Sequence, residues 1–198
     1  MIALIDYRAG NLTSVKKALA AVGAEVFVPS RPEALAAAHG IIVPGVGHFG
    51  ATRALDRAWV DAIRTRVDGG CPLLGICLGL QWLYDASDEA SDVQGLGVLS
   101  GRVFRLPASN GIKIPHVGWN SLSIVRDAPI VGGVADQVQV YFTHSYVAPV
   151  TADTVAIAEH GQPFAAIVQR GHVAGVQFHP EKSGETGLRI LRNFVKGL

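Results

Sequence analysis

A cysteine set between two glycines is the first feature of this sequence that suggests chemistry. Gly75-Ile76-Cys77-Leu78-Gly79 lies where an apolar run meets a helical pattern. A Gly-x-nucleophile-x-Gly turn is sharp, and its glycines relieve crowding around the strained central residue. The turn places the sulfur near the positive end of the next helix, which favours thiolate. We predict that Cys77 is a nucleophile and that the N–H of Leu78 faces a developing oxyanion. The alternative, a buried structural cysteine, is our interpretation of Cys71.

A cysteine nucleophile needs a general base, most often histidine. His179-Pro180-Glu181 offers one with a carboxylate beside it. Pro180 favours an extended conformation at His179, and residues i and i+2 of an extended chain project to the same side. Glu181 can then orient the His179 ring while the other ring nitrogen faces the sulfur, as in a hydrolytic triad. A metal site made of Cys77, His179 and Glu181 is the weaker interpretation, because no dense ligand motif accompanies these residues.

The segments around these residues predict an α/β fold. In the first half, short apolar runs alternate with helical spacing, which indicates parallel strands covered by helices on both faces. The expected strands are 2–5, 24–28, 41–43 and 72–76, and the expected helices lie at 12–22, 55–66 and 78–84. Another short alanine-rich helix is expected after Ser30.

The second half reads as strands with short turns, which favours antiparallel pairing. These strands are expected at 103–106, 117–125, 138–142, 154–159, 164–169 and 172–178, before a closing helix from residue 184. We predict one domain, residues 1–198, with a central mostly parallel sheet, flanking helices and antiparallel strands in the C-terminal half.

Composition excludes several classes of protein. Of 198 residues, 49% are hydrophobic and 17% are charged, which argues against disorder. The net charge of +1 and the lack of a basic run argue against nucleic-acid binding. The longest apolar run, 71–84, is interrupted by Gln81 and is too short to cross a membrane. No secretory signal and no disulfide framework are visible, so we expect a cytoplasmic protein.

The two motifs together resemble the class I, or triad, glutamine amidotransferases: Gly75-Ile76-Cys77-Leu78-Gly79-Leu80-Gln81 and His179-Pro180-Glu181. Nearly the whole chain is similar to one branch of that family, through the segments Asp6-Tyr7-Arg8-Ala9-Gly10-Asn11-Leu12, Pro44-Gly45-Val46-Gly47-His48-Phe49, Pro115-His116-Val117-Gly118-Trp119-Asn120, Thr143-His144-Ser145-Tyr146 and Gln177-Phe178-His179-Pro180-Glu181-Lys182-Ser183.

The resemblance implies hydrolysis of L-glutamine to glutamate and ammonia without a cofactor. It further implies a heterodimer, in which ammonia passes to a (β/α)8-barrel cyclase subunit that makes imidazole glycerol phosphate and AICAR in histidine biosynthesis. The chain has no Walker loop and no G-x-G-x-x-G, which fits a subunit that leaves the nucleotide chemistry to its partner.

The resemblance also assigns roles to residues. It makes Cys77 the nucleophile, His179 the base and Glu181 its orienter. It takes the second oxyanion donor from Val46 or Gly47. The substrate contacts that it implies are Gly47, Gln81, Glu89, His144, Ser145 and Tyr146, and our candidates for the partner surface are Asn11, Trp119, Asn120, Tyr141 and Lys182. The chain departs from the family at Val147, where an arginine is expected.

Other functions stay open at this point. A glutaminase of pyridoxal phosphate synthase or an anthranilate-type subunit would keep the triad and change the pathway, although Trp119-Asn120 and Lys182-Ser183 argue against both. A stand-alone cysteine hydrolase or peptidase would share the turn. A regulatory module with an inactive site is disfavoured by the intact Cys77, His179 and Glu181.

Overall fold

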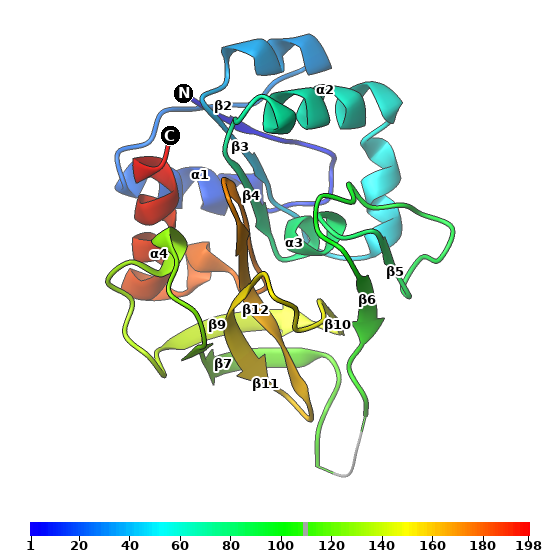
Figure 1. Cartoon of the computed structure of the whole chain (residues 1–198), viewed down its shortest axis with the longest axis vertical. Helices are drawn as coiled ribbons and strands as arrows, with labels where there is room; N and C mark the ends of the chain where they lie inside the picture. The colour runs from blue at the N-terminus through cyan, green and yellow to red at the C-terminus, as the bar shows by residue number, and fades with distance from the viewer. Residues whose placement is uncertain (109–110) are drawn as a thin grey trace.

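A computed structural model describes residues 1–108 and 111–198 of the chain. Its centre is an eight-stranded sheet with the order β2-β1-β3-β4-β13-β12-β11-β8 (Figure 1). The strands, in that order, are Val26–Phe27, Ile2–Leu4, Gly40–Val43, Leu73–Ile76, Val173–Val176, Pro163–Arg170, Thr154–Glu159 and Ser123–Ile124. The pairings from β2 to β13 are parallel, and those from β13 to β8 are antiparallel. The predicted α/β class is confirmed.

Two hydrophobic cores lie on the two faces of this sheet, and β1 shows why. Ile2 and Leu4 belong to one core, whereas Ala3 and Ile5 belong to the other. This alternation is the period of a strand buried on both faces. It explains the continuous apolar run at the start of the sequence.

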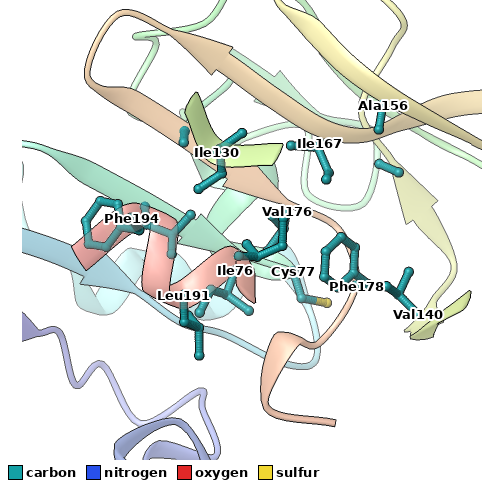
Figure 2. Packing of buried hydrophobic residues seen from close by; sticks show 14 of the residues in the cluster. Ile76, Cys77, Ile130, Val140, Ala156, Ile167, Val176, Phe178, Leu191 and Phe194 are labelled. Atoms are coloured by element: carbon teal, nitrogen blue, oxygen red, sulfur yellow. The ribbon is translucent and has the colours of Figure 1, made fainter. Parts of the chain in front are cut away.

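Each core is closed by its own helices (Figure 1). α1 (Leu12–Ala21) and α4 (Gly184–Lys196) cover the first face, and α2 (Arg57–Asp68) and α3 (Leu78–Trp82) cover the second. Figure 2 shows the first core, where Leu191 and Phe194 of α4 approach Ile76 and Val176 at the ends of β4 and β13. The two central strands are thereby held between packed layers.

Several expected elements have different bounds. The segment after Ser30 is a 3₁₀ helix, Pro32–Ala37, whose N-terminus has no side-chain cap. The helix expected from residue 55 begins at Arg57, where the Asp56 side chain accepts a hydrogen bond from the N–H of Trp59. A separate 3₁₀ helix, Phe49–Ala54, precedes it.

The strand expected at 117–125 is two strands, β7 (His116–Ser121) and β8, because the two pair with different neighbours and β8 pairs with β11 in the central sheet. β7 pairs in antiparallel fashion with β9 (Gln139–His144), outside the central sheet. A third, small sheet has the order β10-β6-β5 and contains Tyr146–Val147, Arg102–Arg105 and Ala86–Ser87. In the part of the chain described here, no helix has the length and apolar character needed to span a membrane.

Candidate active site

The predicted nucleophile lies on the turn from β4 to α3. Cys77 has φ 54°, a left-handed value that side chains rarely adopt. A Cβ on Gly75 would lie 2.6 Å from the backbone of Gly79, and a Cβ on Gly79 would lie 1.8 Å from the carbonyl oxygen of Val43. The turn therefore requires glycine at both positions, which explains their spacing around Cys77.

His179 follows β13 and is held by its backbone and by Glu181. Its N–H donates to the carbonyl oxygen of Tyr141 at 2.9 Å, and its Nδ1 donates to Oε1 of Glu181 at 2.9 Å. The extended backbone expected at His179 is present, with φ −99° and ψ 99°. Glu181, however, reaches the ring through a 3₁₀ turn, Pro180–Lys182, rather than through a continued extended chain.

The charge state of His179 reflects both of its neighbours. Burial by itself lowers the pKa of His179, but Cys77 and Glu181 together raise it to about 10. Both Cys77 and Glu181 therefore favour the protonated form of the His179 imidazole. Nε2 of His179 is buried and has no hydrogen-bond partner among the described residues, so this nitrogen is unengaged. An unengaged ring nitrogen opposite an oriented one is the arrangement that proton transfer requires.

A cavity of about 310 Å³ opens beside Cys77. The structure brings all six predicted substrate contacts to its wall, together with four other residues: Gly47, Gln81, Glu89, His144, Ser145 and Tyr146, with Cys77, Leu78, Pro115 and Thr143. They come from the loop after β3, from the turn into α3 and α3 itself, from the segment after β5, from the residue before β7, and from the end of β9 and the start of β10. The carboxyl ends of parallel strands are where ligands bind in such sheets.

Glu89 is half-buried at this cavity. Its Oε2 accepts a hydrogen bond from the backbone N–H of Phe49 at 2.6 Å. A carboxylate anchored in this way has a fixed position, unlike a carboxylate that extends freely into solvent. It presents negative charge to the cavity, where an ammonium group would be attracted.

We call residues 45–47, which follow β3, the oxyanion loop, and in this closed conformation the expected oxyanion donors are taken up by other acceptors. The N–H of Leu78 donates to the carbonyl oxygen of Gly45 at 3.3 Å, and the N–H of Val46 donates to that of Ala9 at 2.5 Å. The expected oxyanion donor Leu78 is therefore engaged in this conformation, because the neighbouring loop supplies an acceptor. Gly47 lies on the same loop with φ 95°.

Three of the partner-surface candidates form one cluster. Trp119 is 57% exposed and stands edge-on to Tyr141, with ring centroids 6.0 Å apart, and Nζ of Lys182 lies 5.6 Å from the Tyr141 ring centroid. The Asn120 amide instead turns inward, and Nδ2 donates to the carbonyl oxygen of Glu159 at 2.8 Å. Asn11 caps α1 through a hydrogen bond from the N–H of Ser14.

Sequence reasoning missed three buried polar side chains near the site. Gln177 and His116 take part in hydrogen bonds that lead to the cavity, and the Tyr7 hydroxyl lies beside the oxyanion loop. Gln177 stands two residues before His179, so the alternation already used for Glu181 would have found it. Val147, where an arginine was expected, is fully buried in β10, which leaves no room for a cation there. Within the described ranges no cluster of three histidine, cysteine or acidic side chains is arranged to hold a metal.

Comparison with known proteins agrees with this geometry. The family model described as "Glutamine amidotransferase class-I" matches residues 3–198. The imidazole glycerol phosphate synthase subunit HisH of Gloeobacter violaceus is 51% identical over 98% of this chain and 88% of its own length. HisH of Methanothermobacter thermautotrophicus is 44% identical over 99% of this chain and 98% of its own.

Solved structures support the fold. PurLQS from Thermotoga maritima aligns with a TM-score of 0.78 and 20% identity, covering 98% of this chain and 97% of that one. A crystal structure described as a glutamine amidotransferase aligns with a TM-score of 0.77 and 23% identity, over 99% and 97% of the two chains. At these identities the likeness concerns the fold alone.

Proposed function

The chain belongs to the class I glutamine amidotransferases and, within them, to the HisH subunits of imidazole glycerol phosphate synthase, and from this premise we propose that Cys77, His179 and Glu181 are its catalytic triad. The chain is thus a glutamine amidotransferase of histidine biosynthesis. The similarity to HisH proteins decides the pathway among the triad enzymes considered from the sequence.

One observation carries the assignment of the triad. Cys77 lines a cavity and lies close enough to His179 to raise its pKa, Glu181 orients that imidazole at 2.9 Å, and the six residues that the family assigns to substrate line the same cavity. Glutamine fits this arrangement with its ammonium group toward Glu89 and its side-chain amide toward Cys77. The Tyr146 segment and Gly47 then face its polar groups with backbone N–H and C=O.

In the first half-reaction, His179 already holds the proton of Cys77, as its raised pKa indicates, and the thiolate attacks the side-chain amide carbon of glutamine. The carbonyl π electrons move to oxygen, and the tetrahedral oxyanion needs donors at Leu78 and at Val46 or Gly47. When the C–N bond breaks, the electron pair leaves with nitrogen and His179 returns the proton, which gives ammonia and a glutamyl thioester.

In the second half-reaction, water attacks the thioester carbon while His179 accepts its proton. The C–S bond of the second tetrahedral species breaks, glutamate leaves, and the Cys77 sulfur is again a thiolate beside the protonated His179. Glu181 does not take up a proton itself. It fixes the orientation of the His179 ring and stabilises the imidazolium in both half-reactions.

The ammonia must reach a second active site, because this chain has no nucleotide-binding motif of its own. We propose that the partner is a (β/α)8-barrel cyclase subunit that uses the ammonia to make imidazole glycerol phosphate and AICAR. The cluster of Trp119, Tyr141 and Lys182 supports a contact face near the cavity, since exposed aromatic residues with a cation are typical of interfaces.

We further propose that residues 1–198 form one domain, since strands from both halves of the chain share the eight-stranded sheet. A cytoplasmic location is proposed as well, because histidine biosynthesis draws on soluble metabolites.

Trapping of Cys77 tests the proposed function. A glutamine analogue with an electrophilic side chain should alkylate Cys77, and addition of the barrel cyclase with its nucleotide ligand should accelerate the reaction. Cys77→Ala should abolish both trapping and glutamine hydrolysis. Glutamine hydrolysis that persists unchanged in Cys77→Ala would overturn the mechanism.

A further inference from the structure

Gln177 is a fully buried side chain that touches the nucleophile. Its Nε2 lies 3.6 Å from the Cys77 sulfur, a donor–sulfur hydrogen-bond distance, and Gln177 is 0% exposed. We propose that Gln177 is a positioning residue of the glutaminase: its amide orients the Cys77 sulfur toward the cavity and stabilises the thiolate. This inference rests on the proposed role of Cys77.

The sheet register places Gln177 next to Cys77. β13 runs parallel to β4, with Val176 opposite Ile76, and the N–H of Cys77 donates to the carbonyl oxygen of Val176 at 2.8 Å. Gln177 follows Val176 and Cys77 follows Ile76, so the backbone pairing of the two strands places Gln177 beside Cys77. His179 follows Gln177 by two residues, after a bend at residues 177 and 178. One segment therefore supplies both the base and an uncharged donor.

The orientation of the Gln177 amide is settled by its second partner. Oε1 of Gln177 accepts a hydrogen bond from Nε2 of Gln81 at 3.2 Å. Because Oε1 faces a donor, the NH₂ group of Gln177 must face the sulfur. Gln81 uses its other amide hydrogen for the carbonyl oxygen of Tyr146, at 2.9 Å. The side-chain amides of Gln177 and Gln81 thus connect the Cys77 sulfur to the Tyr146 carbonyl at the substrate cavity by hydrogen bonds.

The hydrogen bonds continue beyond Tyr146 to β7. Nδ1 of His144 donates to the Tyr146 carbonyl at 3.2 Å, so Nε2 of His144 is left to accept from Nδ1 of His116 at 3.1 Å. Nε2 of His116 then accepts from Nδ2 of Asn120 at 3.3 Å. Burial lowers the pKa of both histidines, so each ring stays neutral in the one tautomer that this order requires.

This network gives Gln177 a different task from His179. A histidine must gain and lose a proton during turnover, and its interaction with sulfur changes with each step. An amide N–H remains a donor throughout, and a hydrogen bond to the charged form favours that form. Gln177 therefore holds the sulfur in place while His179 moves the proton.

The test is the pH dependence of Cys77 alkylation by iodoacetamide in the full chain, followed on the Cys77 peptide by mass spectrometry so that Cys71 does not contribute. Gln177→Met keeps the side-chain length and removes the donor. We expect the half-maximal pH to rise by about 1 unit and the rate at neutral pH to fall about 10-fold. The matched control is Gln169→Met on β12, which loses hydrogen bonds to Ile130 and Gly171 away from the sulfur and should leave the profile unchanged.

Gln177→Glu covers the case in which Gln177→Met does not fold. Its carboxyl group has the shape of the amide and donates to sulfur only when protonated. The half-maximal pH of alkylation should therefore rise in this variant too, a change that a purely structural role would not produce.

Glutamine hydrolysis with the cyclase bound provides the second readout, and kcat should fall about 10-fold in Gln177→Met with KM changed less than about 3-fold. An unchanged alkylation profile in the folded variants, with wild type active on glutamine, would overturn the role of Gln177. A wild-type chain that does not hydrolyse glutamine would instead overturn the proposed function.

Discussion

The carbonyl oxygen of Gly45 accepts a hydrogen bond from the backbone N–H of Leu78 at 3.3 Å. The same peptide group directs the N–H of Val46 away from the cavity, to the carbonyl oxygen of Ala9. The orientation of this one peptide group therefore keeps the N–H groups of Leu78 and Val46 from serving as oxyanion donors. Rotating it by about half a turn would free Leu78 and turn the Val46 N–H toward the cavity. Such a rotation changes ψ of Gly45 and φ of Val46, and Gly45, which has no side chain, tolerates the change.

The isolated chain should accordingly be a slow glutaminase. Removal of a single oxyanion donor costs about 100-fold to 1,000-fold in kcat, and here two donors are engaged. We expect glutamine hydrolysis by the chain alone to be at least about 100-fold slower than in the complex with the cyclase and its nucleotide ligand. Ammonia release measured with and without the partner checks this. Full turnover by the isolated chain would show that the loop opens unaided.

Gly45→Ala in the oxyanion loop should lower the folding stability of the chain. A Cβ at Gly45 would lie 1.9 Å from the Tyr7 hydroxyl and 2.9 Å from Cβ of Leu78. We expect a loss of about 1–3 kcal/mol in the free energy of unfolding, measured by urea denaturation, because the packed surroundings must shift. Gly10→Ala is the control on the neighbouring segment, since its Cβ would meet nothing closer than 3.6 Å.

Tyr7→Phe should partly rescue Gly45→Ala. The Tyr7 hydroxyl is buried without a hydrogen-bond partner among the described residues, so its removal alone costs little. In the double variant it also removes the atom nearest to the new methyl group. The contact with Leu78 remains, so recovery of stability should be partial. Strict additivity of the two single variants would contradict the contact.

The parts of the site that sequence reasoning reached are those that depend on local geometry. Gly75, Gly79 and Cys77 lie within one turn, and Glu181 stands two residues from His179. Continuous apolar runs indicated the central parallel strands, because a strand buried on both faces leaves a direct mark in the sequence.

The parts that were missed depend on contacts between distant segments. Gln177 acquires its role from the register of β13 on β4, and His116 from the pairing of β7 with β9. The closed state of the oxyanion loop depends on the carbonyl oxygen of Ala9, which lies 37 positions before Val46 in the chain. The division of the strand at Leu122 follows from a change of partner strand, from β9 to β11, which alternation alone does not reveal.

Glu181→Gln should slow glutamine hydrolysis by removing the carboxylate that supports His179. The amide cannot stabilise an imidazolium as a carboxylate does, so we expect kcat for glutamine hydrolysis to fall about 100-fold to 10,000-fold with the fold retained. Glu185→Gln is the control, because that carboxylate is exposed and pairs with Arg192 away from His179. Equal activity of Glu181→Gln and wild type would remove Glu181 from the triad.

The same variant should lower the pKa of His179. In the native chain that pKa is raised from 6.5 to about 10, so its contribution to stability is complete below pH 6.5 and is lost as pH rises toward 10. Glu181→Gln should reduce this loss. Urea denaturation at pH 7 and pH 9 measures the difference, and an unchanged slope would contradict the ion pair.

Trp119→Ala should weaken binding of the cyclase subunit. Trp119 is 57% exposed beside Tyr141 and Lys182, and large aromatic residues dominate the energy of many interfaces. We expect a loss of about 2 kcal/mol or more in binding free energy, measured by calorimetric titration, without loss of folding stability. Val150→Ala, at an exposed position outside β7 and β9, should bind as wild type does. Equal affinities would place the interface elsewhere.

His116 should make the protein sensitive to mild acid. Burial first, and the charge of His160 second, lower the pKa of His116 from 6.5 to about 4. The unfolded chain then binds more protons than the folded chain between pH 6.5 and 4, so the free energy of unfolding falls as pH falls through this window. A proton added to His116 goes to Nε2, where it would face the Nδ2 donor of Asn120 and break that hydrogen bond.

His116→Gln should flatten this acid slope in urea denaturation between pH 7 and 5, with His144 accounting for what remains. His39→Gln is the control, because His39 lies exposed at the surface and its loss should keep the wild-type slope. Since His116 connects β7 to the Tyr146 carbonyl through His144, the variant should also raise KM for glutamine. A slope and a KM that both match wild type would mean that the histidine pair neither stays neutral nor supports the cavity.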